Sequence, residues 1–255
     1  MQDYLNPTWQ AVLAHNGFTD FAALWHVESG WFEPPNERRG GWSGVTRLEL
    51  TRPDGTTCAV FLKRQENHNT FSWWHPLQGV PTFLREFRLI LRYRAADIPS
   101  LEPVFFAIRS QRALLVTEEL AGFAGLDHHL AVWPTLDAAS RRRIIDTVAA
   151  LTRRLHAAGL QHNCYYPKHV FVKVGAGGTV EARIIDLEKS RWNPLARQRS
   201  VRDLDTLNRY APACSRSERL RFLKAYLGIT RLTPAAKSLW RALAARMARK
   251  TRARA

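Results

Sequence analysis

The chain has 255 residues, a length that suits one large domain or two lobes around a shared cleft. Hydrophobic residues make up 45% and charged residues 24% of the chain, which excludes disordered, collagenous and coiled-coil proteins. Three cysteines, Cys58, Cys164 and Cys214, are too few for a disulfide scaffold, so we expect a reducing compartment. No signal peptide is visible, and the apolar stretches are shorter than the roughly 20 residues that span a bilayer. We therefore expect a cytoplasmic protein.

The chain is strongly basic, with 38 Lys and Arg, 22 Asp and Glu and a net charge of +16. The surplus is greatest at the C-terminus, where eleven cations and no acidic residue follow Glu218. A segment of one sign favours polyanions such as nucleic acid, anionic lipids or phosphorylated glycans. No helix-turn-helix, zinc-finger or RNA-binding signature is present, so we expect no nucleic-acid partner. We expect residues 249–255 to rest on an anionic membrane surface and residues 239–247 to pack as a final helix.

The first 120 residues read mostly as sheet. Residues 44–50 and 58–64 predict a hairpin, because Gly55 supplies a turn between two apolar strands. Residues 82–95 predict a helix with one apolar face. Two further strands are expected at 104–109 and 113–120.

The second half is mostly helical. The apolar period of residues 138–158 predicts the strongest helix of the chain, which ends at Gly159. A polar loop follows at 161–168, then a hairpin formed by residues 169–174 and 180–186. The remainder, from about residue 203, is expected to be helical.

The change of character falls near residues 121–125, a short Gly-containing connector. We therefore predict an α+β fold of two lobes. Residues 1–120 form a sheet-rich N-lobe, and residues 121–255 form a helical C-lobe. The cleft between two such lobes is the usual place for a ligand.

Three glycines, Gly40, Gly41 and Gly44, lie where the chain enters the first hairpin strand. Glycines let backbone N–H groups approach a phosphate closely, so this stretch is a candidate nucleotide-binding turn. Their spacing follows the kinase glycine pattern only loosely, and a plain turn explains them equally well.

Lys63 ends an apolar strand beside this turn, and Glu86 lies at the border of the apolar face of helix 82–95. An acid in that position needs a cation, because an unpaired buried charge is costly. We predict an ion pair that aims Lys63 at phosphate groups. The alternatives are a solvated lysine and a surface glutamate that pairs with Arg85.

The candidate catalytic and metal-binding residues of the second half are His162, Cys164 and His169 of the polar loop, and Asp186 at the end of an apolar strand. A carboxylate in that place is a natural magnesium ligand, although a helix cap or turn would use it too. One cysteine with two histidines is not a zinc spacing, and no third member of a nucleophilic triad is evident. A zinc site and a cysteine nucleophile are therefore disfavoured.

Taken in order, these features resemble a protein-kinase-like fold and, more narrowly, the bacterial lipopolysaccharide kinase family, often called the InaA family. The resemblance covers roughly residues 35–230. Its most specific stretches are residues 85–87 (REF), 115–120 (LVTEEL), 155–162 (LHAAGLQH) and 185–189 (IDLEK).

The resemblance implies ATP and Mg²⁺ as cofactors and phosphorylation of an inner-core sugar, heptose or Kdo, of lipopolysaccharide or of a lipid A precursor. It places Lys63 on the phosphates, with Glu86 orienting it, and Asp186 on the metal. The segment formed by Glu118, Glu119 and Leu120 is implied to meet adenine through its backbone.

One departure from the kinase pattern His-x-Asp-x-x-x-x-Asn bears on activity. Counting from His162 puts Cys164 at the position of the catalytic Asp and His169 at the metal-binding Asn. A thiol with an ordinary pKa near 8.5 is mostly protonated at neutral pH and is a weak base. The alternative function is a silent, kinase-like binding module in envelope stress or regulation. Catalysis survives if another carboxylate, such as Asp203 or Asp205, reaches the acceptor.

Overall fold

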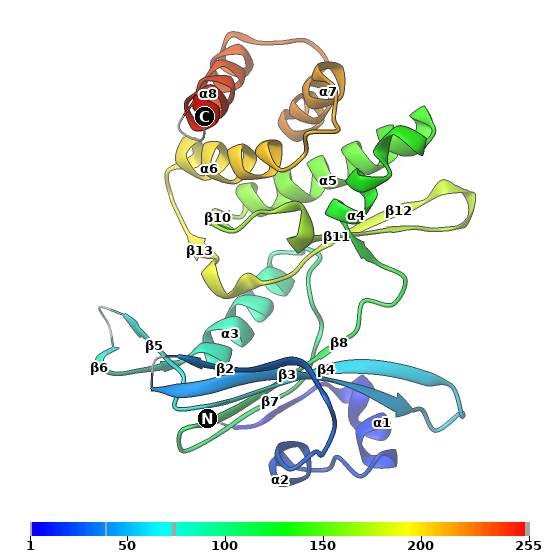
Figure 1. Ribbon diagram of the computed structural model, residues 1–255, viewed down its shortest axis with the longest axis vertical. Coiled ribbons are helices and arrows are strands. Elements are labelled where there is room, and N and C mark those ends of the chain that lie inside the picture. Colours follow the sequence, from blue (N-terminus) through cyan, green and yellow to red (C-terminus); the bar gives the residue numbers. More distant parts are fainter. Residues whose placement is uncertain (1, 39, 73–74, 253–255) are drawn as a thin grey trace. The chain divides into compact units, whose positions relative to one another are not determined.

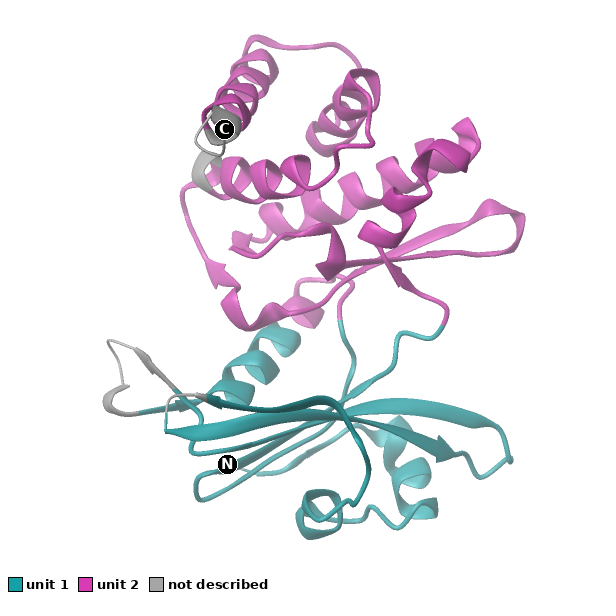
Figure 2. Cartoon of the chain, in the orientation of Figure 1, with its two compact units in different colours: residues 1–92, 101–121 teal, residues 93–100, 122–255 magenta. Residues whose placement is uncertain are grey.

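The computed structural model describes residues 2–38, 40–72 and 75–252. Its chain forms two compact units (Figure 2). Residues 1–92 and 101–121 make up unit 1, and residues 93–100 and 122–255 make up unit 2. The predicted α+β class is confirmed, since unit 1 is built on a sheet and unit 2 is mainly helical. In the described part of the chain, no helix has the length and apolarity needed to cross a bilayer.

Unit 1 is built on a six-stranded antiparallel sheet (Figure 1). In spatial order the strands are β1 (Tyr4–Leu5), β7 (Pro103–Arg109), β8 (Arg112–Glu118), β4 (Thr57–Glu66), β3 (Gly41–Thr51) and β2 (Trp31–Arg38). The predicted turn joins β3 to β4, and Gly55 adopts a φ of +82° there, which favours glycine.

Helices cover both faces of this sheet. On one face, α1 (Gln10–His15) and α2 (Phe21–Trp25) bury Leu13 and Leu24 in a cluster that includes Leu62 and Val116 of the central strands. These two helices were not predicted from the sequence. They extend the core of unit 1 beyond the predicted hairpins.

The other face carries α3 (Thr82–Ala95), whose bounds are those predicted. Phe87 of α3 stacks on Phe106 of β7, with ring centroids 4.3 Å apart. Ile90 and Tyr93 are fully buried on the same helix. A hairpin of β5 (Asn69–Ser72) and β6 (His75–Pro81) precedes α3 and was not predicted.

Unit 2 contains five α-helices and several short strands within the described residues (Figure 1). The helices are α4 (Leu126–Ala131), α5 (Ala138–Ala157), α6 (Ala196–Arg209), α7 (Arg216–Leu227) and α8 (Pro234–Arg252). The strands are β9 (Ala124–Gly125), β10 (Leu160–Gln161), β11 (Val170–Val174), β12 (Val180–Ile184) and β13 (Arg191–Trp192). Short 3₁₀ helices occur at Pro7–Trp9 in unit 1, and at Trp133–Thr135, Pro167–His169, Ala176–Gly178 and Leu187–Lys189 in unit 2.

The long helix α5 organises this unit. Asp137 caps it by accepting hydrogen bonds from two backbone N–H groups of the first turn, and Gly159 follows its end with a φ of +74°. Its Ala149 lies in a core cluster with residues of α6 and α7. Leu239, Trp240 and Leu243 of α8 pack against that cluster, which confirms the packing predicted for the final helix.

Two expectations for the C-terminal part need adjustment. Helix begins at Ala196 rather than near residue 203, and loops at 210–215 and 228–233 divide the helical region into three. Residues 253–255 of the basic tail lie outside the described residues.

Candidate functional site

The ion pair predicted in unit 1 is confirmed. Nζ of Lys63 lies 2.6 Å from Oε1 of Glu86. Strand β4 places Lys63 opposite Val45 of β3 and Leu115 of β8, while α3 supplies the glutamate. The Glu86 residue is only 4% exposed, so its carboxylate depends on this partner for compensation. The pair therefore fixes the lysine ammonium against the sheet.

The three glycines sit in and after the turn between β2 and β3. Gly40 has a φ of +79°, which suits a residue without a side chain. A Cβ on Gly41 would lie 2.1 Å from the Glu66 carbonyl oxygen, and one on Gly44 would lie 2.6 Å from the Trp31 ring. Close packing thus requires both glycines. Their nucleotide-binding role stays a prediction.

The segment expected to meet adenine begins at Glu118, the last residue of β8. The backbone N–H groups of Glu118 and Glu119 already donate to neighbouring carbonyls at 3.0 Å. The Glu119 carboxylate binds Arg47 through two hydrogen bonds of 2.6 and 2.9 Å, which lower the pKa of Glu119. Among the described residues, the N–H of Leu120 has no acceptor. Leu120 is therefore the backbone donor of this segment that an adenine could use.

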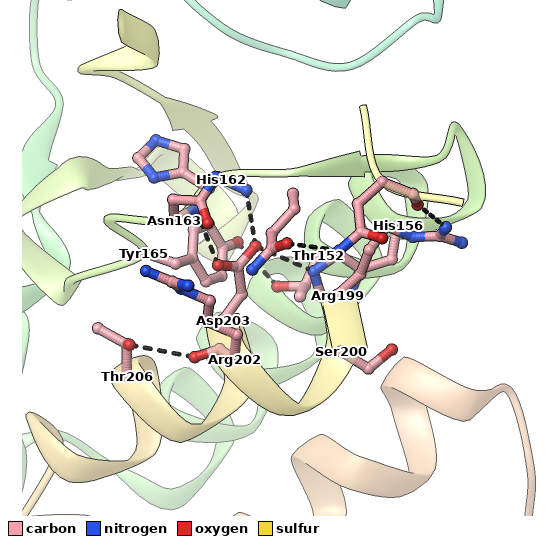
Figure 3. Close-up of polar contacts among 12 residues, drawn as sticks. Thr152, His156, His162, Asn163, Tyr165, Arg199, Ser200, Arg202, Asp203 and Thr206 are labelled. Carbon is pink, nitrogen blue, oxygen red and sulfur yellow. Dashed lines mark hydrogen bonds and ion pairs between the residues drawn. The ribbon is translucent and has the colours of Figure 1, made fainter. Parts of the chain in front are cut away.

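In unit 2, the polar loop 162–169 is held by Asp203 of α6 (Figure 3). The Asp203 carboxylate accepts the backbone N–H of His162 at 2.7 Å and that of Asn163 at 3.0 Å. The ring of His156 donates to the same carboxylate at 3.2 Å. Asp203 is fully buried, so its charge is compensated by these donors alone among the described residues. It sets the course of the loop.

Neither carboxylate considered as a substitute base has that role. Both oxygens of Asp203 bind the loop backbone. Asp205 is 1% exposed and lies 3.4 Å from the Nε atoms of Arg209 and Arg246. Neither Asp203 nor Asp205 is therefore available to accept the proton of the acceptor hydroxyl in place of Cys164.

We expect Asp203→Asn to lower the free energy of unfolding by about 3 kcal/mol, because it replaces a buried charge-assisted acceptor with an amide. Asp146→Asn is the matched control, since its partner Arg221 and Asp146 itself are both over 40% exposed. An exposed pair contributes under about 1 kcal/mol. Urea unfolding and hydrogen exchange at the His162 amide measure the effect. Equal losses in both variants would contradict this role of Asp203.

His162 is fully buried and both ring nitrogens are occupied. Nε2 donates to the Ile185 carbonyl at 3.0 Å, and Nδ1 accepts the N–H of Cys164 at 3.3 Å. Burial lowers the pKa of His162, which favours the neutral ring that this pattern requires. His162 therefore ties the loop to the chain before Asp186 and acts as a positioning residue.

Asp186 lies just beyond β12, with a φ of +56°. His169 connects it to the loop, since Nδ1 of His169 is 3.3 Å from Asp186 Oδ2 and 2.8 Å from the Cys164 carbonyl oxygen. The structure thus brings His162, Cys164, His169 and Asp186 together within unit 2. The left-handed backbone turns the chain directly after the strand.

Cys164 is half-buried, and burial raises the pKa of its thiol. The neighbouring Lys189 lowers this pKa but does not outweigh the burial. At neutral pH the side chain is therefore a neutral thiol and accepts a proton poorly.

A magnesium ion fits the carboxylate of Asp186 better than the imidazole of His169. Within the described residues, no three His, Cys, Asp or Glu side chains could hold a metal ion by themselves. Mg²⁺ usually needs only one or two carboxylates when phosphates supply the other ligands. The Asp186 side chain is 35% exposed, which leaves it accessible. Imidazole nitrogen suits this hard cation poorly.

A family model described as the lipopolysaccharide kinase (Kdo/WaaP) family matches residues 22–226. The chain belongs to this family. The resemblance seen in the sequence is confirmed, and membership of a kinase family implies the use of ATP.

The chain is similar to two named proteins of Escherichia coli. Protein InaA of Escherichia coli K12 is 33% identical over 204 residues, which cover 76% of this chain and 88% of that protein. Lipopolysaccharide core heptose(I) kinase WaaP of Escherichia coli is 27% identical over 186 residues, 68% of this chain and 67% of the relative.

A solved structure of WaaP in complex with acyl carrier protein aligns with a TM-score of 0.69 at 23% identity, covering 98% of each chain. At this identity the likeness concerns the fold alone. It confirms the predicted kinase-like fold.

Proposed function

We propose that this protein transfers the γ-phosphate of ATP to a hydroxyl of an inner-core lipopolysaccharide sugar, heptose or Kdo. The observation that carries the proposal is the Lys63–Glu86 ion pair in a chain of the lipopolysaccharide kinase family. In kinase-like proteins, a strand lysine held by a helix glutamate contacts the ATP phosphates.

The remaining roles follow from the same geometry. Leu120 donates its free N–H to adenine, and the turn at Gly40 and Gly41 gives the phosphates access to backbone N–H groups. Asp186 holds Mg²⁺, with His169 steadying its carboxylate. The ion supplies electrostatic compensation for the phosphate oxygens.

The site lacks a carboxylate at the position of the base that would accept the proton of the acceptor hydroxyl. A carboxylate base would contribute about 10²–10⁴-fold to the rate, and Cys164 offers a protonated thiol instead. Phosphoryl transfer depends mainly on positioning and charge compensation, so the reaction can proceed slowly without that base. We infer a slow kinase.

A silent binding module is the second candidate, and the raised pKa of Cys164 favours it. Such a module would bind ATP or a partner in envelope stress or regulation without transferring phosphate. Both functions use Lys63 and Leu120 for nucleotide. They differ only in whether phosphate reaches a sugar.

The partners that we propose are the lipopolysaccharide core, or a lipid A precursor, and the anionic inner-membrane surface. Exposed cations of α8, among them Lys237, Arg241 and Arg249, support the membrane contact. The tail at 253–255 lies outside the described residues, so its part in the contact rests on sequence charge. This proposal places the protein at the cytoplasmic side of the inner membrane.

An acyl carrier protein is a further proposed partner. The similar WaaP structure is a complex with that protein. In unit 2 of this chain, an apolar cavity of 690 Å³ is lined by residues of α4 to α8 and of the 3₁₀ helix Trp133–Thr135, including Trp133, Ile144 and Trp240. Such a lining favours a hydrocarbon chain over a sugar. We propose that it accommodates an acyl group.

Transfer of radiolabelled phosphate from ATP to purified inner-core lipopolysaccharide tests the proposed function. The kinase proposal predicts labelled lipopolysaccharide. ATP binding without labelled product would favour the silent module.

A further inference from the structure

A second hollow of unit 2 is basic. It has a volume of 720 Å³ and lies among β10, β13, α6 and α8. The residues that matter for its chemistry are Gln161, Arg191, Asn193, Ala196, Arg202 and Arg246. No carboxylate of the described residues lines it. We call it the basic hollow.

Three arginines come to the basic hollow from three different elements. Arg191 belongs to β13, Arg202 to α6 and Arg246 to α8. Arg191 and Arg202 are exposed, and among the described residues neither guanidinium has a hydrogen bond or an ion pair. Arg246 is held near buried Asp205, which it shares with Arg209. The local charge is therefore positive and largely uncompensated.

The wall of the hollow also carries a helix N-terminus. Helix α6 starts at Ala196, and the preceding Leu195 offers no side-chain acceptor to the first turn. The first N–H groups of a helix lack intrahelical partners and carry partial positive charge, so they favour an anion. This feature adds to the arginines and points to the same ligand charge.

Two polar side chains of the basic hollow, those of Gln161 and Asn193, are held in place by hydrogen bonds. Asn193 donates from Nδ2 to Oε1 of Gln161 at 2.7 Å, and its Oδ1 accepts the N–H of Leu195 at 3.0 Å. Gln161 is 1% exposed and Asn193 is 8% exposed. Gln161 directly precedes His162, so the basic hollow adjoins loop 162–169 within unit 2.

We infer that the basic hollow is a subsite for an anionic group, a phosphate or a carboxylate, carried by the sugar acceptor. Guanidinium groups bind both anions through paired N–H donors. The identity of the acceptor rests on the proposed function. Kdo supplies a carboxylate, whereas a phosphorylated core sugar supplies a phosphate, and either would be anchored beside the loop that carries Cys164.

Isothermal titration calorimetry of the whole protein without nucleotide tests this subsite. The probes are Kdo monosaccharide, mannose 6-phosphate and neutral mannose. We expect binding of at least one anionic sugar, and none of mannose. The double variant Arg191→Gln/Arg202→Gln should weaken that binding by at least about tenfold, because each lost pair of charge-assisted hydrogen bonds is among the stronger polar contacts.

Arg142→Gln/Arg231→Gln is the matched control, since it removes the same charge from two exposed arginines outside the hollow. It should bind like the wild type. Arg191→Gln alone, on an exposed side chain, replaces the double variant if that variant unfolds. Binding of Kdo alone assigns a carboxylate, and binding of mannose 6-phosphate alone assigns a phosphate.

The inference is overturned if neither anionic sugar binds, if mannose binds equally well, or if both double variants bind alike. The titration contains no ATP. Loss of the proposed kinase activity would therefore leave a positive binding result intact, and the two failures can be told apart.

Discussion

Lys63→Met is expected to lower the rate of phosphoryl transfer by about 10²–10³-fold, the usual effect of removing one donor that stabilises developing charge. Methionine retains most of the unbranched side chain and loses the ammonium. The Glu86 carboxylate, 4% exposed, then lacks its cation. Breaking a buried pair costs about 3–5 kcal/mol of stability, and less here because 19% of the Lys63 side chain is exposed.

Two further variants separate catalysis from folding. Lys63→Met/Glu86→Leu removes both charges and should recover much of the stability but none of the transfer. Arg112→Met is the control on the same sheet, because its pair with Glu66 is partly exposed and outside the proposed site. Steady-state kinetics with urea unfolding measure both quantities. Wild-type transfer by a folded Lys63→Met protein would contradict the role of Lys63.

Cys164→Asp is expected to raise the rate of phosphoryl transfer by up to about 10²–10⁴-fold, the range of general-base assistance. The carboxylate would stand two residues after His162, in a loop whose backbone Asp203 already holds. Nucleotide affinity should hardly change, because the base acts on the acceptor hydroxyl. Cys164→Asn is the matched control, with similar size and no base. It should show no gain.

The pH dependence gives the same comparison a second readout. Burial raises the pKa of the Cys164 thiol, so the thiolate fraction is small at neutral pH and increases through the alkaline range. Any transfer assisted by that thiolate should therefore rise with pH. A carboxyl group has an ordinary pKa of about 4, and the same burial would raise it. The carboxylate is still ionised in the alkaline range, so the Cys164→Asp rate should be flat there. A fall in transfer on Cys164→Asp, with the fold intact, would indicate that the thiol itself takes part.

The sequence predicted the parts of the site that depend on local periodicity. Helix α3 has a clear apolar face, so the position of Glu86 at its border indicated a buried acid that needs a cation. The apolar stretch before Lys63 predicted a strand and supplied that cation, although β4 continues to Glu66. Because both elements are regular, the pairing could be inferred without coordinates.

Other features depend on contacts that no local pattern encodes. Helices α1 and α2 have six and five residues, too short to show a helical period. Asp203 binds the backbone of a loop that lies 40 or 41 residues earlier, and in sequence it reads as a polar residue of an amphipathic helix. The basic hollow joins arginines of three elements. Only the folded chain brings these residues together.

The most direct test of the kinase assignment is transfer of radiolabelled phosphate from ATP to purified inner-core lipopolysaccharide by the wild type and by Asp186→Ala. Asp127→Asn, on a half-exposed side chain of α4, is the control for loss of a negative charge. We predict slow labelling of the sugar by the wild type and the control, and none by Asp186→Ala, because the variant lacks the proposed magnesium ligand. Equal labelling by Asp186→Ala, or no labelling by a wild-type protein that binds ATP, would contradict the assignment.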